Sequence, residues 1–266
     1  MNRDGISKEF FIGRYIYLKD QLENKLPRVY FTRVHGHEAV SFRIWDKEKG
    51  NLVRRRVTEK NPKWNKYREL AAKRAKAEDQ MKKLMSLWQE NHKGSLDMIA
   101  QGYVLRPNAD NPYNTEFWES LKDCANSFPK DRAVKYNGIV MRSLFETEVA
   151  QALDNMGIEY KYDTLIRAGL NEFISPDFSM NLPEFNRCGF TEAMGGLSNL
   201  NYLSDNVDKY RKYLNMGLYP NRDIAMVPAD MDYRPEPDTI IRMIAVILDS
   251  MAKQYVFRKA EIGRPG

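Results

Sequence analysis

The chain has 266 residues, of which 42% are hydrophobic and 29% charged, as in an ordinary globular protein with a substantial core. No stretch of 18 apolar residues is present, so no membrane span is expected, and the N-terminus lacks the apolar segment of a secretory signal. The two cysteines, Cys124 and Cys188, stand in no ligand-like spacing. We therefore expect free thiols, a cytoplasmic location and no membrane partner.

The net charge of +6 conceals an asymmetry between the two parts of the chain. Residues 1–100 contain 23 Lys and Arg against 13 Asp and Glu, a net charge of +10, whereas residues 101–266 have a net charge of −4. This division predicts that the front binds a polyanion and that the rear supplies carboxylates for chemistry. The alternative for the front is a basic surface that serves solubility.

Two kinds of element are expected in the basic region. Residues 27–58 have the β-branched and aromatic alternation of strands, with a turn at 49–51, and residues 63–92 have apolar side chains at helical spacing. Trp64, Trp88 and Trp118 are interpreted as core residues, and His35-Gly36-His37 as a loop. The basic side chains expected to contact DNA are Arg54, Arg55, Arg56, Lys73, Arg74 and Lys76, with a solvated helix face as the alternative for the lysines.

The chain is expected to divide into three parts. A basic strand-and-long-helix region spans 1–105, a connecting segment spans 106–138, and the last part spans 139–266. The connecting segment is turn-rich at 106–114, is predicted to be helical over 117–128, and resembles a linker at 127–131.

From residue 141 onward the pattern is more regular. The predicted order is helix, three strands, helix, strand and helix, with Gly157 ending the first helix. The predicted ranges are 142–156, 158–166, 175–182, 187–194, 203–216, 223–228 and 239–256.

Two carboxylates in this part are predicted to face each other. If 175–182 and 187–194 pair as a hairpin, opposed residues have numbers that sum to 369, so Asp177 lies opposite Glu192 with Cβ atoms about 5 Å apart. Facing carboxylates repel, and a bound divalent cation turns that penalty into attraction. The hairpin therefore predicts a hard-metal site, unless its register is shifted or an Arg or Lys neutralises one carboxylate.

These segments resemble a known nuclease superfamily. The sequence RSLFE at 142–146, followed by Pro176-Asp177-Phe178 and Phe190-Thr191-Glu192, is similar to the motifs of PD-(D/E)XK nucleases. The resemblance covers residues 139–256, under half of the chain. It implies an α/β fold with a restriction-endonuclease-like core, in which an α-β-β-β-α-β order forms a mixed central sheet flanked by helices.

The resemblance also implies roles for individual residues. Glu146, Asp177 and Glu192 match the family's metal ligands for Mg²⁺ or Mn²⁺, and the carbonyl of Ala193 is a further candidate ligand. Periodicity alone does not distinguish Glu146 from Glu148. Arg142 lies one turn before Glu146 and is expected to form an ion pair with it, or to contact phosphate.

One position departs from the family pattern. Met194 stands where the motif lysine is expected, and a thioether cannot orient water or offset negative charge as an ammonium does. The segment EAMGG followed by a helix resembles the variant in which the lysine has moved to the following helix. There Lys209 and Tyr213 fit best, with Lys212 as the second choice.

The expected activity is Mg²⁺-dependent hydrolysis of phosphodiester bonds in DNA by an endodeoxyribonuclease of phage or mobile-element type. Two other classes remain open. The chain is either an inactive nuclease fold that binds nucleic acid or a partner, or one subunit of a restriction, transposition or defence assembly. A homodimer is also compatible with the family.

Overall fold

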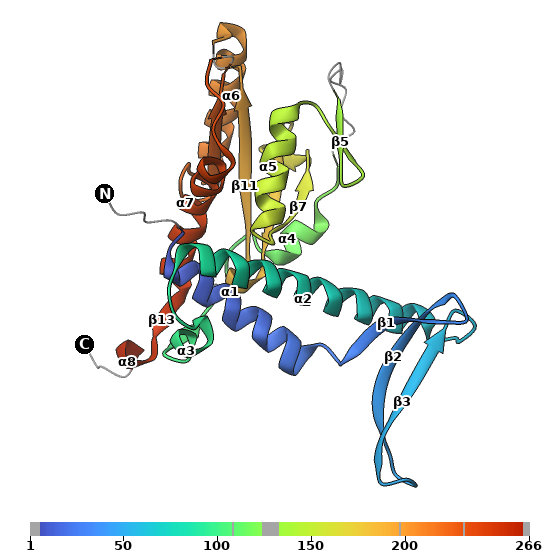
Figure 1. Cartoon of the computed structure of the whole chain (residues 1–266). Coiled ribbons are helices and arrows are strands. Elements are labelled where there is room, and N and C mark those ends of the chain that lie inside the picture. The colour runs from blue at the N-terminus through green and yellow to red at the C-terminus, as the bar shows by residue number, and fades with distance from the viewer. Residues whose placement is uncertain (1–5, 108, 124–132, 197, 231, 263–266) are drawn as a thin grey trace.

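The computed structural model describes residues 6–107, 109–123, 133–196, 198–230 and 232–262. The chain is a mixed α/β protein with helices and several mostly antiparallel sheets. A body built around a four-stranded sheet carries a long helix, and a three-stranded sheet projects from the far end of that helix (Figure 1). Within the part of the chain described, no helix is long and apolar enough to cross a membrane.

The N-terminal region contains the predicted strands and long helix. Three strands form an antiparallel sheet in the order β1-β2-β3. The apolar spacing over 63–92 predicts a helix, and α2 forms there and runs back to the body (Figure 1). The elements are α1 (Lys8–Asp20), the π-helical turn η1 (Gln21–Lys25), β1 (Val29–Val34), β2 (His37–Asp46), β3 (Asn51–Thr58) and α2 (Trp64–Asn91).

Helix α1 is not indicated by the sequence pattern. Its buried residues Phe10, Phe11 and Ile12 follow one another directly, and this spacing gives no amphipathic stripe. The helix is covered on several sides, because it packs against α2, α3 and α7. Apolar periodicity identifies helices that have one buried face, so it did not predict α1.

The connecting segment is less helical than expected. The elements here are α3 (Leu96–Ala100), β4 (Tyr103–Leu105), α4 (Thr115–Ser120), β5 (Val134–Tyr136) and β6 (Ile139–Met141). The prediction of a helix over 117–128 is wrong beyond Ser120, because Leu121 is extended and Asp123 bridges to Thr164. Residues 124–128 of that prediction, the whole expected linker at 127–131, and Cys124 lie outside the described residues.

The central sheet has the strand order β12-β11-β10-β7. Strand β10 pairs antiparallel with β7 and β11, whereas β11 pairs in parallel with β12, so the sheet is mixed. The strand predicted over 158–166 ends early, at Tyr162, because Asp163 adopts a left-handed backbone with φ 52°. The strands are β7 (Glu159–Tyr162), β8 (Ile166–Arg167), β9 (Phe173–Ile174), β10 (Phe178–Leu182), β11 (Arg187–Gly195), β12 (Ile224–Ala229) and β13 (Val256–Arg258).

Helices cover both faces of this sheet. Phe178, Met180 and Leu182 point into the main core with α5 and α7, as the alternation along that strand predicts. Cys188 and Phe190 point to the opposite face and pack with Trp118 of α4 and with α6. The remaining elements are α5 (Leu144–Asn155), the 3-10 turn η2 (Pro183–Phe185), α6 (Leu200–Asn215), α7 (Pro237–Tyr255) and α8 (Lys259–Ile262).

A buried ion pair fixes α1 to the sheet. Arg14 donates to Glu184 of η2 over 2.8 Å and also to the carbonyl of Gly157, and both charged side chains are almost fully buried. Among the residues that the structure describes, the Nε of Arg14 and Oε2 of Glu184 find no hydrogen-bond partner. Water does not reach the pair, so the loss of either partner would leave the other charge buried without a counter-charge.

We expect Arg14→Met to lower the free energy of unfolding by about 3–5 kcal/mol, because Glu184 would remain buried without its cation. The double variant Arg14→Met with Glu184→Leu should recover most of that loss. Lys19→Met is the control on the same helix, since the Lys19–Asp97 pair is exposed and its loss should lower the free energy of unfolding far less. Urea unfolding measures all three, and equal losses at positions 14 and 19 would contradict the assignment.

Candidate functional site

The β10–β11 hairpin has the predicted register. Phe178 is paired with Thr191, and continuing this register by one residue brings Asp177 beside Glu192. Both carboxylates are buried, with 6% and 4% of their surface exposed. The backbone N–H of Ala193 donates to Oδ2 of Asp177 over 2.8 Å, which fixes the Asp177 side chain against β11.

Glu146 reaches this end of the sheet from the first turn of α5. Ser143 begins the helix and forms a reciprocal capping box with Glu146, so the carboxylate folds back over the helix N-terminus. Its Oε2 accepts hydrogen bonds from the backbone of Arg142 and Ser143 and from the hydroxyl of Tyr162, at 2.8–3.0 Å. Helix capping thus positions an acidic side chain beside Asp177.

The guanidinium of Arg142 lies between the carboxylates. It is 3.2 Å from Oε1 of Glu146 and 2.5 Å from Oδ1 of Asp177, with Asp163 at 4.0 Å. The predicted ion pair between Arg142 and Glu146 is therefore confirmed. Neither Tyr162 nor Asp163 was predicted here, because each follows from the short strand β7 and its left-handed end rather than from a motif.

Glu192 has its own cation, from α6 on the other face of the sheet. Lys209 Nζ lies 2.6 Å from Oε2 of Glu192, and the hydroxyl of Tyr213 donates to Oε1. Lys212, the second choice from the sequence, instead pairs with Asp208 at 3.0 Å. The structure thus brings Lys209 and Tyr213, one helical turn apart, onto the same carboxylate.

Burial controls the protonation of this cluster. Burial raises the pKa of Glu192 to about 7 against the opposing effect of Lys209. The pKa of Glu146 is also raised, by burial and then by the charge of Asp177. Burial alone would lower the pKa of Lys209, but Glu192 and Asp177 outweigh it and the pKa is raised, so the ammonium keeps its charge.

The donor atoms suit a hard cation, although they are engaged by protein cations. Carboxylate and carbonyl oxygens from Glu146, Asp177, Glu192 and Ala193 are the ligand type that Mg²⁺ prefers. Among the described residues, no three acidic, histidine or cysteine side chains are already arranged as a metal-binding group. The oxygens point at Arg142 and Lys209 instead, so a metal ion would have to replace at least part of these contacts.

Two residues that the sequence motifs also single out do not take part in the carboxylate cluster. Glu148, the alternative to Glu146, pairs with Arg234 at 2.8 Å on the exposed side of α5. Met194 pairs through its backbone with Pro228 of β12, and its side chain supplies no charge. The structure therefore favours Glu146 over Glu148 and leaves Lys209 as the cation near Glu192.

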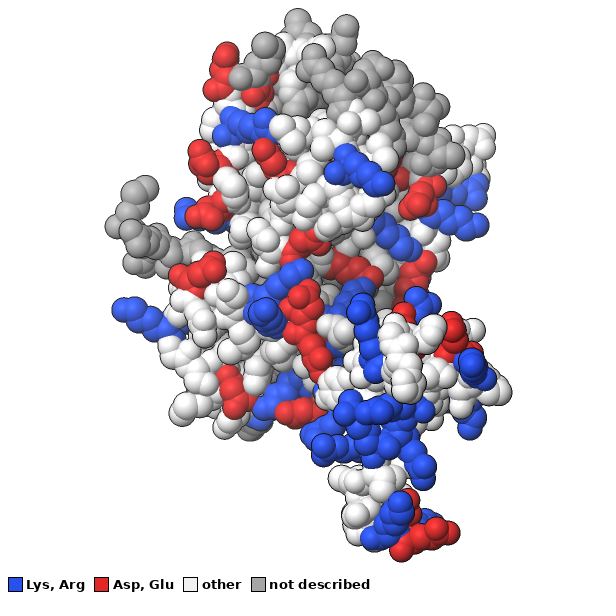
Figure 2. Space-filling model, turned by 45° about the vertical axis from the view of Figure 1, so that its right-hand side comes forward, with Lys and Arg blue, Asp and Glu red and all other residues white. Residues whose placement is uncertain are grey.

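The expected DNA contacts in the N-terminal region are not equally placed. Arg54, Arg55 and Arg56 are all exposed, and Arg55 in addition approaches Asp46 within 3.7 Å. Lysine and arginine side chains gather on the projecting sheet near its junction with the body (Figure 2). The two lysines on α2 pair with carboxylates, Lys73 with Glu69 and Lys76 with Glu159.

Arg74 needs a correction. It is only 7% exposed, and its guanidinium donates to the carbonyls of Leu22, Leu26 and Pro27 and to Glu78. These bonds satisfy the carbonyls at the end of η1 and hold the chain where it enters β1. Helical spacing could not distinguish this buried arginine from the exposed lysines around it, and a contact with DNA is not proposed for it.

No family model, no curated protein and no solved structure matches this chain.

Above a pH of about 4.5, the metal-free protein should lose stability as the pH rises towards 7. Folded Glu192 has a pKa of about 7 against 4.5 for an unperturbed glutamate, so the folded state binds this proton more tightly. The tighter proton of Glu192 stabilises the folded state by on the order of 3 kcal/mol. This stabilisation is fully present below the pKa of the unfolded state and is lost as the pH rises through the pKa of the folded state.

Urea unfolding of the metal-free wild type and Glu192→Gln across this range measures the effect. The glutamine variant should show a flatter dependence of the unfolding free energy on pH, because its side-chain amide does not titrate in this range. Lys209 remains charged over the whole window and adds no slope of its own. Parallel pH profiles for the two proteins would contradict the raised pKa of Glu192.

Proposed function

We propose that the chain is a metal-dependent endodeoxyribonuclease, a variant of the PD-(D/E)XK superfamily with a displaced lysine. One observation carries the proposal. Glu146 comes from α5, Asp177 immediately precedes β10 and Glu192 lies in β11, yet they gather with Lys209 at one end of a mixed sheet. The pKa values of Glu146 and Glu192 are raised by burial, and buried groups with shifted pKa values are found especially at functional sites.

The architecture around the cluster supports a restriction-endonuclease-like core. The sequence of main elements is α5, β7, β10, β11, α6 and β12, with the small β8–β9 hairpin inserted before β10. The sheet is mixed, and helices lie on both faces. This order agrees with the α-β-β-β-α-β arrangement that the motif resemblance implies.

Glu146, Asp177 and Glu192, with the carbonyl of Ala193, would hold Mg²⁺ or Mn²⁺. A bound divalent ion supplies an acidified water and a positive charge next to the scissile phosphate. Arg142 holds Glu146 and Asp177 in place without the ion, since its positive charge lies next to both carboxylates. Once it is released from these carboxylates, the planar guanidinium suits a phosphate oxygen.

Lys209 takes the part that the missing motif lysine would have had. It is charged and held beside Glu192, and a fixed charge in a buried site stabilises negative charge that develops on the phosphate. Tyr213 donates to the other oxygen of Glu192, which leaves that carboxylate with a defined orientation. The two side chains therefore position Glu192 and supply the charge from α6.

A second function is supported by a specific observation. Arg142 and Lys209 already neutralise the carboxylates, and Met194 occupies the usual lysine position. An inactive nuclease fold that binds nucleic acid or a partner protein would have these features too. Cleavage that requires a homodimer or another subunit of a restriction, transposition or defence assembly is a third arrangement compatible with this site.

Plasmid DNA with Mg²⁺ should be cleaved by the wild type and not by Asp177→Asn, because the amide retains the shape but loses the charge that holds a metal. We expect a decrease of at least about 10²-fold in rate. Glu148→Gln is the matched control on α5 and should cleave like the wild type, since Glu148 is paired with Arg234. Undiminished cleavage by Asp177→Asn would refute the metal assignment.

Lys209→Gln should reduce the cleavage rate by about 10²-fold or more, as the loss of one preorganised electrostatic group does. Lys212→Gln, one turn away and paired with Asp208, should leave the rate within a few-fold of the wild type. Thermal unfolding of both variants checks that the fold persists. Equal rates for the two variants would indicate that Lys209 holds Glu192 without acting in catalysis.

A further inference from the structure

The projecting sheet has two chemically different faces. Cross-strand partners share a face, so the registers of β1–β2 and β2–β3 assign every strand residue to one side. Val29, Val40 and Phe42 take the side that packs on α2, where the ring of Phe42 stacks on Tyr67 at 4.6 Å. The other face lies away from the helix and is called the outward face below.

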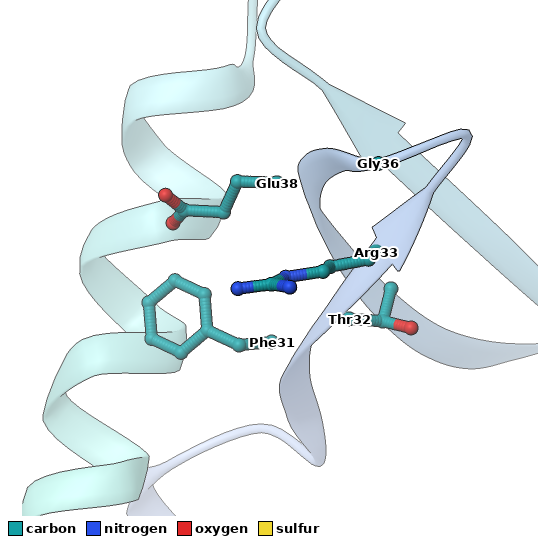
Figure 3. Close-up of a pocket in the computed structure, with 5 residues that line it drawn as sticks. All are labelled: Phe31, Thr32, Arg33, Gly36 and Glu38. Carbon is teal, nitrogen blue, oxygen red and sulfur yellow. The ribbon is translucent and has the colours of Figure 1, made fainter.

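The turn between β1 and β2 shows the alternation directly. Phe31, Arg33 and Glu38 extend toward α2, whereas Thr32 points the other way (Figure 3). Glu38 approaches Arg68 of α2 within 3.6 Å, so the helix-side hollow at this turn contains its own acidic group.

The outward face carries arginines with no acidic partner. Arg43 and Arg54 are direct cross-strand partners, and Arg56 lies on the same face, opposite Ser41. All three are exposed, and among the described residues none forms an ion pair; Arg54 only donates to Ser41 Oγ over 3.2 Å. Like charges on directly opposed residues destabilise a sheet, so a bound polyanion would remove an existing penalty.

Arg55 differs from its two neighbours although it stands between them in the sequence. It is the cross-strand partner of Phe42 and therefore lies on the helix side, where Asp46 is 3.7 Å away. The run of three arginines thus divides, two outward and one toward α2. Only the outward pair joins Arg43.

Apolar side chains extend the outward face at its tip. Trp45 and Leu52 are cross-strand partners there and are 61% and 58% exposed. A tryptophan and a leucine side by side expose apolar surface to water, which is unfavourable unless a ligand covers it. Arginines followed by an exposed aromatic give contacts for phosphates and for the apolar edge of a base or sugar.

We propose that this outward face, formed by Arg43, Arg54, Arg56 and Trp45, binds duplex DNA by placing the β2–β3 ribbon in the major groove. The major groove admits a two-stranded ribbon, and β2 and β3 project free of the body at their connected end (Figure 1). The choice of DNA among polyanions rests on the proposed nuclease function. Arginine forks on an inserted ribbon reach both phosphates and guanine edges.

The test is binding of a short fluorescein-labelled DNA duplex, measured by anisotropy over a series of salt concentrations in a chelator, where no cleavage occurs. Arg54→Gln with Arg56→Gln, and Arg43→Gln separately, should each weaken binding, the double variant by about tenfold or more. The slope of log K against log salt should become shallower by about 0.9 for each phosphate that the variant no longer neutralises. Arg55→Gln removes one charge from the same strand and is the matched control, expected to bind within about twofold of the wild type.

Several results would overturn the proposal. Equal weakening by Arg43→Gln and Arg55→Gln would show a dependence on net charge alone. Unchanged binding by the double variant would exclude the face, and equal arginine-dependent binding of duplex RNA, single-stranded DNA or heparin would show no preference for duplex DNA. A different result separates the two proposals. If the wild type does not cleave DNA but its binding to duplex DNA depends on the outward arginines, the nuclease proposal fails and the binding proposal stands.

Discussion

The central constraint on this molecule is the mutual repulsion of carboxylates buried at one end of its main sheet. Glu146, Asp177 and Glu192 are all under a tenth exposed. Ionised groups so placed persist only with positive charge beside them, and here Arg142 and Lys209 provide it from opposite faces of the sheet. The elements that deliver these two cations, the start of α5 and the middle of α6, are therefore tied to the cluster.

The body also determines where the projecting sheet stands. Arg14 of α1 is held by Glu184 in the interior, and the chain continues through η1, whose terminal carbonyls accept from Arg74 of α2. Two arginines thus anchor the ends of the path that leads to β1. The outward arginines are carried on a sheet whose base is fixed to the body through buried hydrogen bonds rather than through a free linker.

The sequence was informative wherever one local rule decided the structure. Strand alternation and a short turn were enough to place Asp177 opposite Glu192, because a shift by one residue would have turned Phe178 out of the core. Helical spacing located α2, α5 and α7 closely. The same rules missed α1, which is surrounded by other helices, and extended α4 past Ser120, where the chain turns to bridge Thr164.

Taken alone, the sequence determined the hairpin register that places Asp177 beside Glu192 and the basic character of the front region, because these follow from residue type and period. Glu146 was selected by the family resemblance, since period alone did not separate it from Glu148. Tertiary packing decided which charged side chains can contact a ligand and which are engaged by other residues of the protein. It buried Arg74, turned Arg55 toward Asp46, and directed Lys209 rather than Lys212 to Glu192. Charged side chains at similar spacing are equivalent in a sequence, and only the burial and the partners supplied by distant segments make them different.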